Sequence, residues 1–285
     1  MSRLKPYLNV LIGLGLAILA LVVTGAAVRL GVVPLIALTF DPSDEHLSLI
    51  RRGLMLVAFV VGFWAYVRLA ERRPATELGF APKTIAFWIA AGALMIGLPL
   101  VVLYLTGAYT LVAVAGPGGM LGVGLTILAA AMFEEIVFRG VLFAIVWRHF
   151  GIWPALLIPS LIFSALHIFN DNWGGWTPLI AGLAIGIFWS LVYVRTGNVW
   201  AVGLNHAAWN YSIFATGLPL TGQEDWRAMA PLQTDLTGPD WLTGGLAGPE
   251  DSWPIVAMVI IVTGFFLADC WRRGELKRRP TEDDG

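Results

Sequence analysis

The chain has 285 residues, of which 58% are hydrophobic and only 13% are charged. Soluble domains usually contain about 25% charged residues, so this composition excludes an ordinary soluble globular protein. The net charge of −1 gives no reason to expect a nucleic-acid partner. A single cysteine, Cys270, excludes an internal disulfide and a cysteine-rich metal site.

Long apolar segments follow one another along almost the whole chain. A membrane-spanning helix needs about 20 mostly apolar residues, and eight segments approach this length. We therefore predict an all-α fold, a polytopic transmembrane helix bundle with about eight spanning helices that form one membrane domain over residues 1–285. The predicted helices lie at about Leu8–Val28, Gly53–Ala70, Thr84–Leu105, Met120–Arg148, Trp153–Ile168, Pro178–Val194, Val199–Ala215 and Trp253–Cys270.

Two segments near the N-terminus allow more than one interpretation. The basic residues Arg3 and Lys5 before the first apolar segment are also typical of a signal peptide. Signal peptides have a shorter apolar region, of about 7–15 residues, so a retained first helix is favoured. The apolar stretch Leu30–Phe40 either continues this helix past Arg29 or lies against the outer surface.

The distribution of charge predicts how the helices cross the membrane. Lys and Arg are enriched in cytoplasmic loops, and with the N-terminus inside, most basic loop residues fall on the inner side. We therefore predict an integral multi-pass protein with both termini cytoplasmic, in the plasma membrane if the host is a bacterium. Residues 272–285 form a charged tail that we expect to be disordered. The segment Leu218–Asp251, rich in Gly, Pro and Trp, is expected to form an outer loop without its own core.

Three charged residues stand near the middle of the fourth apolar segment: Glu134, Glu135 and Arg139. Charged side chains inside a membrane are costly and are usually paired or functional. Residues four apart share a helix face, so Glu135 and Arg139 can form an ion pair. That pair is as consistent with a structural role as with catalysis. Glu134 lies on a different side of the helix and is less well placed to pair with Arg139. A carboxylate without a close counter-ion suits general acid–base chemistry.

Two of the four histidines also lie within apolar segments. His167 ends the fifth segment, and Phe163 precedes it by four residues on the same helix face. His206 and Asn210 are likewise four apart in the seventh segment. His46 and His149 lie near the ends of segments, where we expect interfacial positions without a function.

If the three segments are neighbours, Glu134, His167, His206 and Asn210 converge on one polar cavity. Glu134 and His167 could then hold and deprotonate a water molecule, while His206 and Asn210 donate to an oxyanion. One carboxylate and two histidines also form a familiar catalytic zinc set, so Glu134, His167 and His206 allow a divalent metal such as zinc. The sequence lacks the two-histidine helical zinc motif with an intervening Glu, so spacing does not require a metal.

At these residues the sequence resembles the CAAX protease and bacteriocin-processing family. This family includes the type II CAAX prenyl endopeptidases and the domain once called abortive infection. The resemblance covers about residues 120–215, which we regard as the motif-bearing core. The family has three motifs, and all three occur here in order. Glu134, Glu135 and Arg139 match Glu-Glu-x-x-x-Arg, and Phe163 and His167 match Phe-x-x-x-His. His206 and Asn210 match His-x-x-x-Asn/Asp.

The resemblance implies an intramembrane endopeptidase of eight helices. It assigns water activation to Glu134 with His167, and oxyanion or water binding to His206 and Asn210. Glu135, Arg139 and Phe163 take supporting positions, and metal dependence is left open. The resemblance also implies cleavage at the cytoplasmic side, whereas the charge distribution places His167 near the outer end of its helix.

Membrane-associated or prenylated peptides and proteins are the substrates that this resemblance implies, with the lipid bilayer as the surrounding partner. Two other functions remain open. Buried carboxylates and histidines also relay protons in transporters, although no clear inverted repeat is present. A non-catalytic membrane immunity or scaffold protein would use the same polar residues only for structure.

Overall fold

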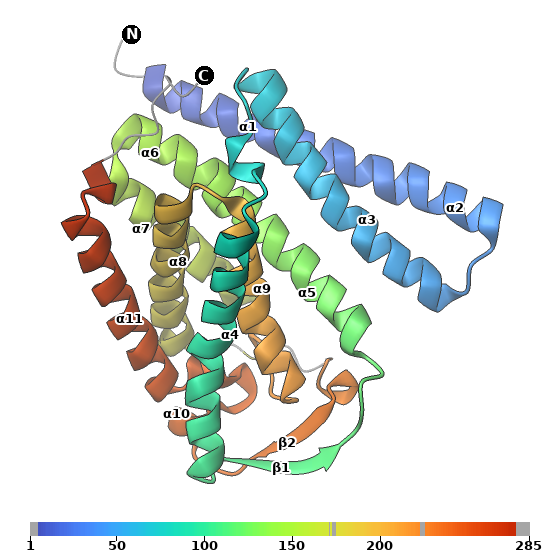
Figure 1. The fold of residues 1–285 in the computed structure, drawn as a ribbon, viewed down its shortest axis with the longest axis vertical. Coiled ribbons are helices and arrows are strands. Elements are labelled where there is room, and N and C mark those ends of the chain that lie inside the picture. The colour runs from blue at the N-terminus through green and yellow to red at the C-terminus, as the bar shows by residue number, and fades with distance from the viewer. Residues whose placement is uncertain (1–4, 171, 173–174, 223–225, 278–285) are drawn as a thin grey trace.

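The apolar segments of the sequence form long helices that cross one another in a bundle (Figure 1). The computed structural model describes residues 5–170, 172, 175–222 and 226–277. Most of the charged tail 272–285 therefore lies outside the described residues. The α-helices are α1 Lys5–Ala26, α2 Val33–Phe40, α3 Asp44–Ala65, α4 Pro82–Leu105, α5 Met120–Glu135, α6 Ala144–Phe150, α7 Ile152–Leu166, α8 Trp176–Thr196, α9 Val199–Ala215, α10 Asp240–Thr243 and α11 Trp253–Arg272.

Seven helices in the described part of the chain are long and apolar enough to cross a membrane. The all-α polytopic bundle is therefore confirmed, with seven helices of spanning length instead of about eight. The predicted segment Val199–Ala215 is helical with those bounds, as α9, but has 17 residues. It packs against α4, α5 and α8 near the centre of the bundle. The other spans are Tyr7–Phe40, Asp44–Ala70, Pro82–Leu105, Met120–Phe150, Ile152–Phe169, Trp176–Thr196 and Trp253–Arg272.

The first two spans extend beyond the predicted segments. Leu30–Phe40 continues the first helix through a π-helical turn at Ala27–Val32. The second span begins at Asp44 and not at Gly53, because the Ser43 side chain accepts a hydrogen bond from the backbone at the new N-terminus. The acidic residues in this first turn also favour a helix start, so the helix extends past the apolar run.

Two further π-helical turns are present in the described residues. Tyr66–Ala70 follows α3, and Ile136–Phe143 joins α5 to α6 directly after the two glutamates. Such wide turns occur mostly as short interruptions of α-helices and are frequent at functional sites. Here the turn Ile136–Phe143 carries Arg139, and α5 and α6 nevertheless form one continuous span of 31 residues.

Close helix packing brings α4 against α9. A Cβ atom at Gly92 would clash with the backbone oxygen of Asn205, so glycine permits this approach. The Asn205 side chain is buried, and its amide donates to the carbonyl oxygen of Trp88 at 2.7 Å. It also accepts a hydrogen bond from Trp189 Nε1 of α8 at 2.9 Å. Asn205 therefore links α4, α8 and α9.

The described residues of 216–252 form a structured cap on one end of the bundle, and we call them the cap segment. Strand β2, Leu232–Leu236, pairs antiparallel with β1, Tyr109–Val114. Tyr109 donates from its hydroxyl to the carbonyl oxygen of Thr243 at 2.7 Å, and cap residue Leu218 is buried. The expected outer loop is thus ordered against the bundle, and its strand was not predicted. The described residues contain six short 3₁₀ turns. Three lie in this segment, at Arg227–Met229, Gly245–Ala247 and Pro249–Asp251, and the others are Thr76–Leu78, His167–Phe169 and Glu275–Lys277.

The cap segment lies at the end of the bundle opposite to the start of α1 and the end of α11 (Figure 1). The start of α1 and the end of α11 are therefore on the same side. This agrees with an even number of passes through the membrane when α9 is counted together with the seven spans.

We predict opposite effects for two glycine substitutions in α4. Gly92→Ala should lower the thermal unfolding temperature in detergent, because the added Cβ atom meets backbone and forces α4 from α9, at a cost of about 1–3 kcal/mol. Gly97→Ala has open space around its Cβ atom and should be neutral or stabilising by up to about 1 kcal/mol. Equal unfolding temperatures for the two variants would contradict the close α4–α9 approach.

Candidate active site

A buried ion pair lies at the centre of the bundle. Arg139 and Glu135 both have 0% exposure, and Arg139 Nη1 lies 2.9 Å from the Glu135 carboxylate. Arg139 Nη2 donates to the carbonyl oxygen of Gly186 in α8 at 2.8 Å. The pair predicted from the four-residue spacing is therefore present, and it ties the α5 span to α8.

The same carboxylate also holds His206 of α9. His206 Nδ1 lies 2.8 Å from Glu135 Oε1, and its Nε2 lies 3.9 Å from Glu134 Oε2. The imidazole stacks on the Trp189 ring with a centroid distance of 3.8 Å. The sequence did not predict that Glu135 contacts His206, because spacing along one helix says nothing about a neighbouring helix.

These contacts form a continuous polar chain from Arg139 through Glu135 and His206 to Glu134. A carboxylate that accepts a hydrogen bond from Nδ1–H fixes the orientation of the imidazole and directs Nε2 to the other side. When His206 is protonated, two cations face two carboxylates, and the buried set is electrically balanced. Nε2–H is then a donor directed toward Glu134.

His167 occupies the short 3₁₀ turn His167–Phe169 at the end of α7. Its Nδ1 lies 2.7 Å from the carbonyl oxygen of Phe163, so Nδ1 donates and Nε2 carries the free lone pair. The Phe163 ring packs against the His167 ring at a centroid distance of 4.6 Å and against His206 at 6.2 Å. Phe163 therefore supports both imidazoles. Among the described residues, His167 makes no direct hydrogen bond to Glu134.

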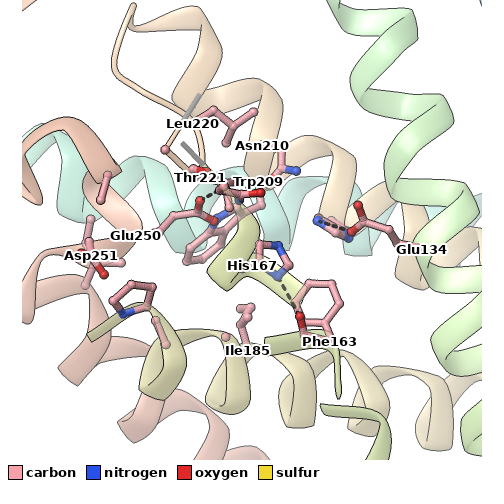
Figure 2. Close-up of a pocket in the computed structure, with 18 of the residues that line it drawn as sticks. Glu134, Phe163, His167, Ile185, Trp209, Asn210, Leu220, Thr221, Glu250 and Asp251 are labelled. Carbon is pink, nitrogen blue, oxygen red and sulfur yellow. Dashed lines mark hydrogen bonds and ion pairs between the residues drawn. The ribbon is translucent and has the colours of Figure 1, made fainter. Parts of the chain in front are cut away.

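Glu134, His167, His206 and Asn210 all line one cavity of about 200 Å³. Figure 2 shows His167 between Glu134 on one side and the acidic residues Glu250 and Asp251 on the other. Glu134 is half-buried, with 34% of its side chain exposed, while Glu135 and Arg139 are fully buried and do not line the cavity. The structure thus brings the four predicted catalytic residues together. Within the described residues, the Asn210 amide has no hydrogen-bond partner and is available to a bound molecule.

Residues 116–212 match the family model of type II CAAX prenyl endopeptidase Rce1-like proteins. Over this segment, about a third of its length, the chain is similar to that family. All seven motif residues fall inside the matched segment, which runs from just before α5 to near the end of α9. No curated protein and no solved structure gives a significant match to the chain.

Several cavity residues of this CAAX-protease-like chain were missed by the sequence analysis. Glu250 enters from the cap segment and accepts hydrogen bonds from Trp209 Nε1 at 2.8 Å and from Thr221 Oγ1 at 2.9 Å. Asp251 lines the cavity beside it. The length of the cap segment could have indicated these residues, because long connections in compact domains are often functional.

The CAAX-protease-like site can also be compared with the zinc set. Among the described residues, no three or more His, Cys, Asp and Glu side chains are placed so as to hold a metal ion. Glu134, His167 and His206 as arranged therefore do not fit a metal site, and we derive no step through a metal.

We predict that Arg139→Leu destabilises the protein more than the double variant Glu135→Leu/Arg139→Leu. Removal of the guanidinium alone leaves a buried carboxylate without its counter-ion, at a cost of about 3–5 kcal/mol. Removal of both charges avoids that penalty. Thermal unfolding in detergent, followed by tryptophan fluorescence, gives the order of the two variants. A double variant that unfolds at or below the temperature of Arg139→Leu would contradict the interpretation.

We also predict that the cap segment loosens as pH rises. Burial and the charge of Glu250 raise the pKa of Asp251 from its ordinary 3.8 to about 7. The folded state therefore favours protonated Asp251, and its contribution to stability is lost between about pH 4 and pH 7. Hydrogen–deuterium exchange of cap amides, corrected for intrinsic rates, should increase from pH 5 to pH 8 in the wild type. Asp251→Asn should remove this increase, and an unchanged pH dependence in that variant would contradict the assignment.

Proposed function

We propose that this protein is an intramembrane endopeptidase that hydrolyses a peptide bond in a membrane-associated or lipidated substrate. The observation that supports this proposal best is the convergence of Glu134 and two imidazoles on one cavity. That cavity is built mainly from the segment that matches the CAAX prenyl endopeptidase family.

Glu134 is the proposed general base. Its carboxylate borders the cavity, and His167 Nε2 is the ring nitrogen that Phe163 leaves free. A water molecule held between these two groups can transfer a proton to Glu134 as it attacks the scissile carbonyl carbon. Such positioned proton transfer typically contributes about 10²–10⁴-fold to the rate. Glu134 then returns this proton to the leaving amine.

His206 and Asn210 are the proposed oxyanion donors. His206 Nε2 is directed toward the cavity because Nδ1 is held by Glu135, and Asn210 has an amide without a partner in the described residues. A donor that is already oriented loses little energy in reorganisation when charge develops on the carbonyl oxygen. Trp189 stacks on the imidazole and keeps its plane fixed.

A membrane-embedded or prenylated peptide fits the surroundings of the site. The cavity walls include apolar residues such as Ile127, Ile185 and Val259, and the bundle around them faces lipid. A cavity of about 200 Å³ accommodates a short extended stretch of peptide, not a folded domain. A lipid anchor would concentrate such a peptide in the bilayer beside the site.

The charge distribution supports an orientation with both chain ends in the cytoplasm. At the end of the bundle away from the cap segment, Arg72 and Arg73 lie between α3 and α4, Lys83 lies in the first turn of α4, and Arg148 lies in the last turn of α6. Such basic residues are enriched on the cytoplasmic side. On this orientation the cap segment and the cavity entrance lie on the outer side. Reactivity of single cysteines with membrane-impermeant reagents in intact cells tests this orientation.

We expect loss of peptide cleavage in Glu134→Gln, His167→Ala and His206→Ala. The assay uses the purified full chain in detergent and a library of prenylated and transmembrane peptides, with products identified by mass spectrometry. Loss of the base should lower the rate by about 10²–10⁴-fold, and loss of an oxyanion donor by about 10²–10³-fold. Each variant is checked for an unchanged elution volume and unfolding temperature.

His149→Ala is the matched control. His149 makes the same local contact as His167, from Nδ1 to the carbonyl oxygen four residues earlier at 2.9 Å, but it does not line the cavity. This variant should retain full activity. Wild-type rates in the three site variants would contradict the proposed roles. Abolition of wild-type cleavage by a chelator would favour the zinc alternative, and proton-linked flux in liposomes without cleavage would favour a transporter.

A further inference from the structure

A second concave surface lies on the lateral face of the bundle, away from the candidate active site. It is a groove of about 1180 Å³ lined by α4, α8 and α11. None of its lining residues also lines the cavity that holds Glu134 and His167. The groove exists because α4 packs mainly on α9 and α11 packs mainly on α8, so that α4 and α11 touch only sparsely.

The walls of this lateral groove are apolar over most of its length. Three aromatic rings meet in it: Phe266 lies 5.7 Å from Trp88 and 5.6 Å from Phe188 between ring centroids. Farther along, Leu94 and Leu98 of α4 are exposed. From Lys83 to Pro99, α4 rises about 24 Å, which is most of the roughly 30 Å of a bilayer core. The groove therefore has the length and polarity for an acyl chain.

One end of the lateral groove carries positive charge. Lys83 is exposed there and makes no ion pair within the described part of the chain. Arg195 lies at the same end, where Asp269 at 2.7 Å and Glu275 at 3.1 Å neutralise it. Asp269 is shared with Arg273 at 2.9 Å. Among the described residues, the three cations Lys83, Arg195 and Arg273 thus face two carboxylates at this end, and Lys83 is the one that makes no ion pair.

The backbone adds donors at the same end. Lys83 and Thr84 occupy the first turn of α4, where no side chain caps the helix N-terminus. Their amide groups precede the first intrahelical hydrogen bond, which Ile85 donates to Ala81 at 2.9 Å. Uncapped amides at a helix N-terminus favour an anion such as phosphate.

We infer that the lateral groove binds one anionic phospholipid of the bilayer, with an acyl chain along α4 and the phosphate beside Lys83. A phospholipid satisfies both observations at once, because it joins an apolar chain to a negative charge. Lys83 lies in the first turn of α4, shortly after the connection that carries Arg72 and Arg73, and lipid headgroups lie at this end of a spanning helix. The inference does not depend on the proposed protease activity, because the groove and the cavity are separate.

Native mass spectrometry of the purified full chain in mild detergent tests this inference. The probes are phosphatidylglycerol and phosphatidylcholine with identical acyl chains. We expect one phosphatidylglycerol to bind the wild type and phosphatidylcholine to bind more weakly. Lys83→Gln should weaken phosphatidylglycerol binding about fivefold, because one basic residue near the surface contributes about 1 kcal/mol. Ala91→Trp, which fills the groove, should abolish retention of either lipid.

Arg68→Glu is the control, since Arg68 is exposed near the same end of the bundle but does not line the groove. It should bind phosphatidylglycerol like the wild type. Equal binding of the two lipids, or unchanged binding in Lys83→Gln, would overturn the inference. If the wild type retains no lipid but forms a dimer that Ala91→Trp disrupts, the groove would instead be assigned to a second copy of the chain. Lys83→Gln alone keeps the test decisive if Ala91→Trp does not fold.

Discussion

The ion pair between Arg139 and Glu135 determines how the surrounding helices meet. Withdrawal of two charges from water costs several kcal/mol per ion, and only close geometry and further hydrogen bonds offset that cost. Here the further partners are the carbonyl oxygen of Gly186 in α8 and the imidazole of His206 in α9. The pair can therefore be satisfied only when α5, α8 and α9 are in place together. The direction of the proposed oxyanion donor follows from the same contacts.

The cavity combines parts of the chain that differ in character. The segment that matches the protease family contributes Glu134, His167 and His206, while the cap segment contributes Glu250 and Asp251. Trp209 joins the two parts, because its indole donates to Glu250. The cap segment thereby forms part of the cavity wall. Electrostatic interactions are stronger in such an enclosed site than in water.

The bundle separates a polar interior site from an apolar lateral surface. Asn205 stands between them: it hydrogen-bonds to Trp88, which lines the groove, and to Trp189, which lines the cavity. A lipid in the lateral groove would therefore rest against α4 and α8, which pack on the helix α9 that carries His206 and Asn210. The two surfaces nevertheless use different side chains, so substitutions can address each one alone.

The sequence by itself determined the membrane-embedded helical fold, because apolar runs of spanning length leave few alternatives. It also determined the pairing of Glu135 with Arg139, since a four-residue spacing fixes neighbours on one helix face. The start of the second span was misplaced because the Ser43 cap extends that helix beyond its apolar run. Only the tertiary structure decided that Glu135 also holds His206 and that the cap segment lines the cavity. Those contacts join residues far apart in the chain, and no local periodicity encodes them.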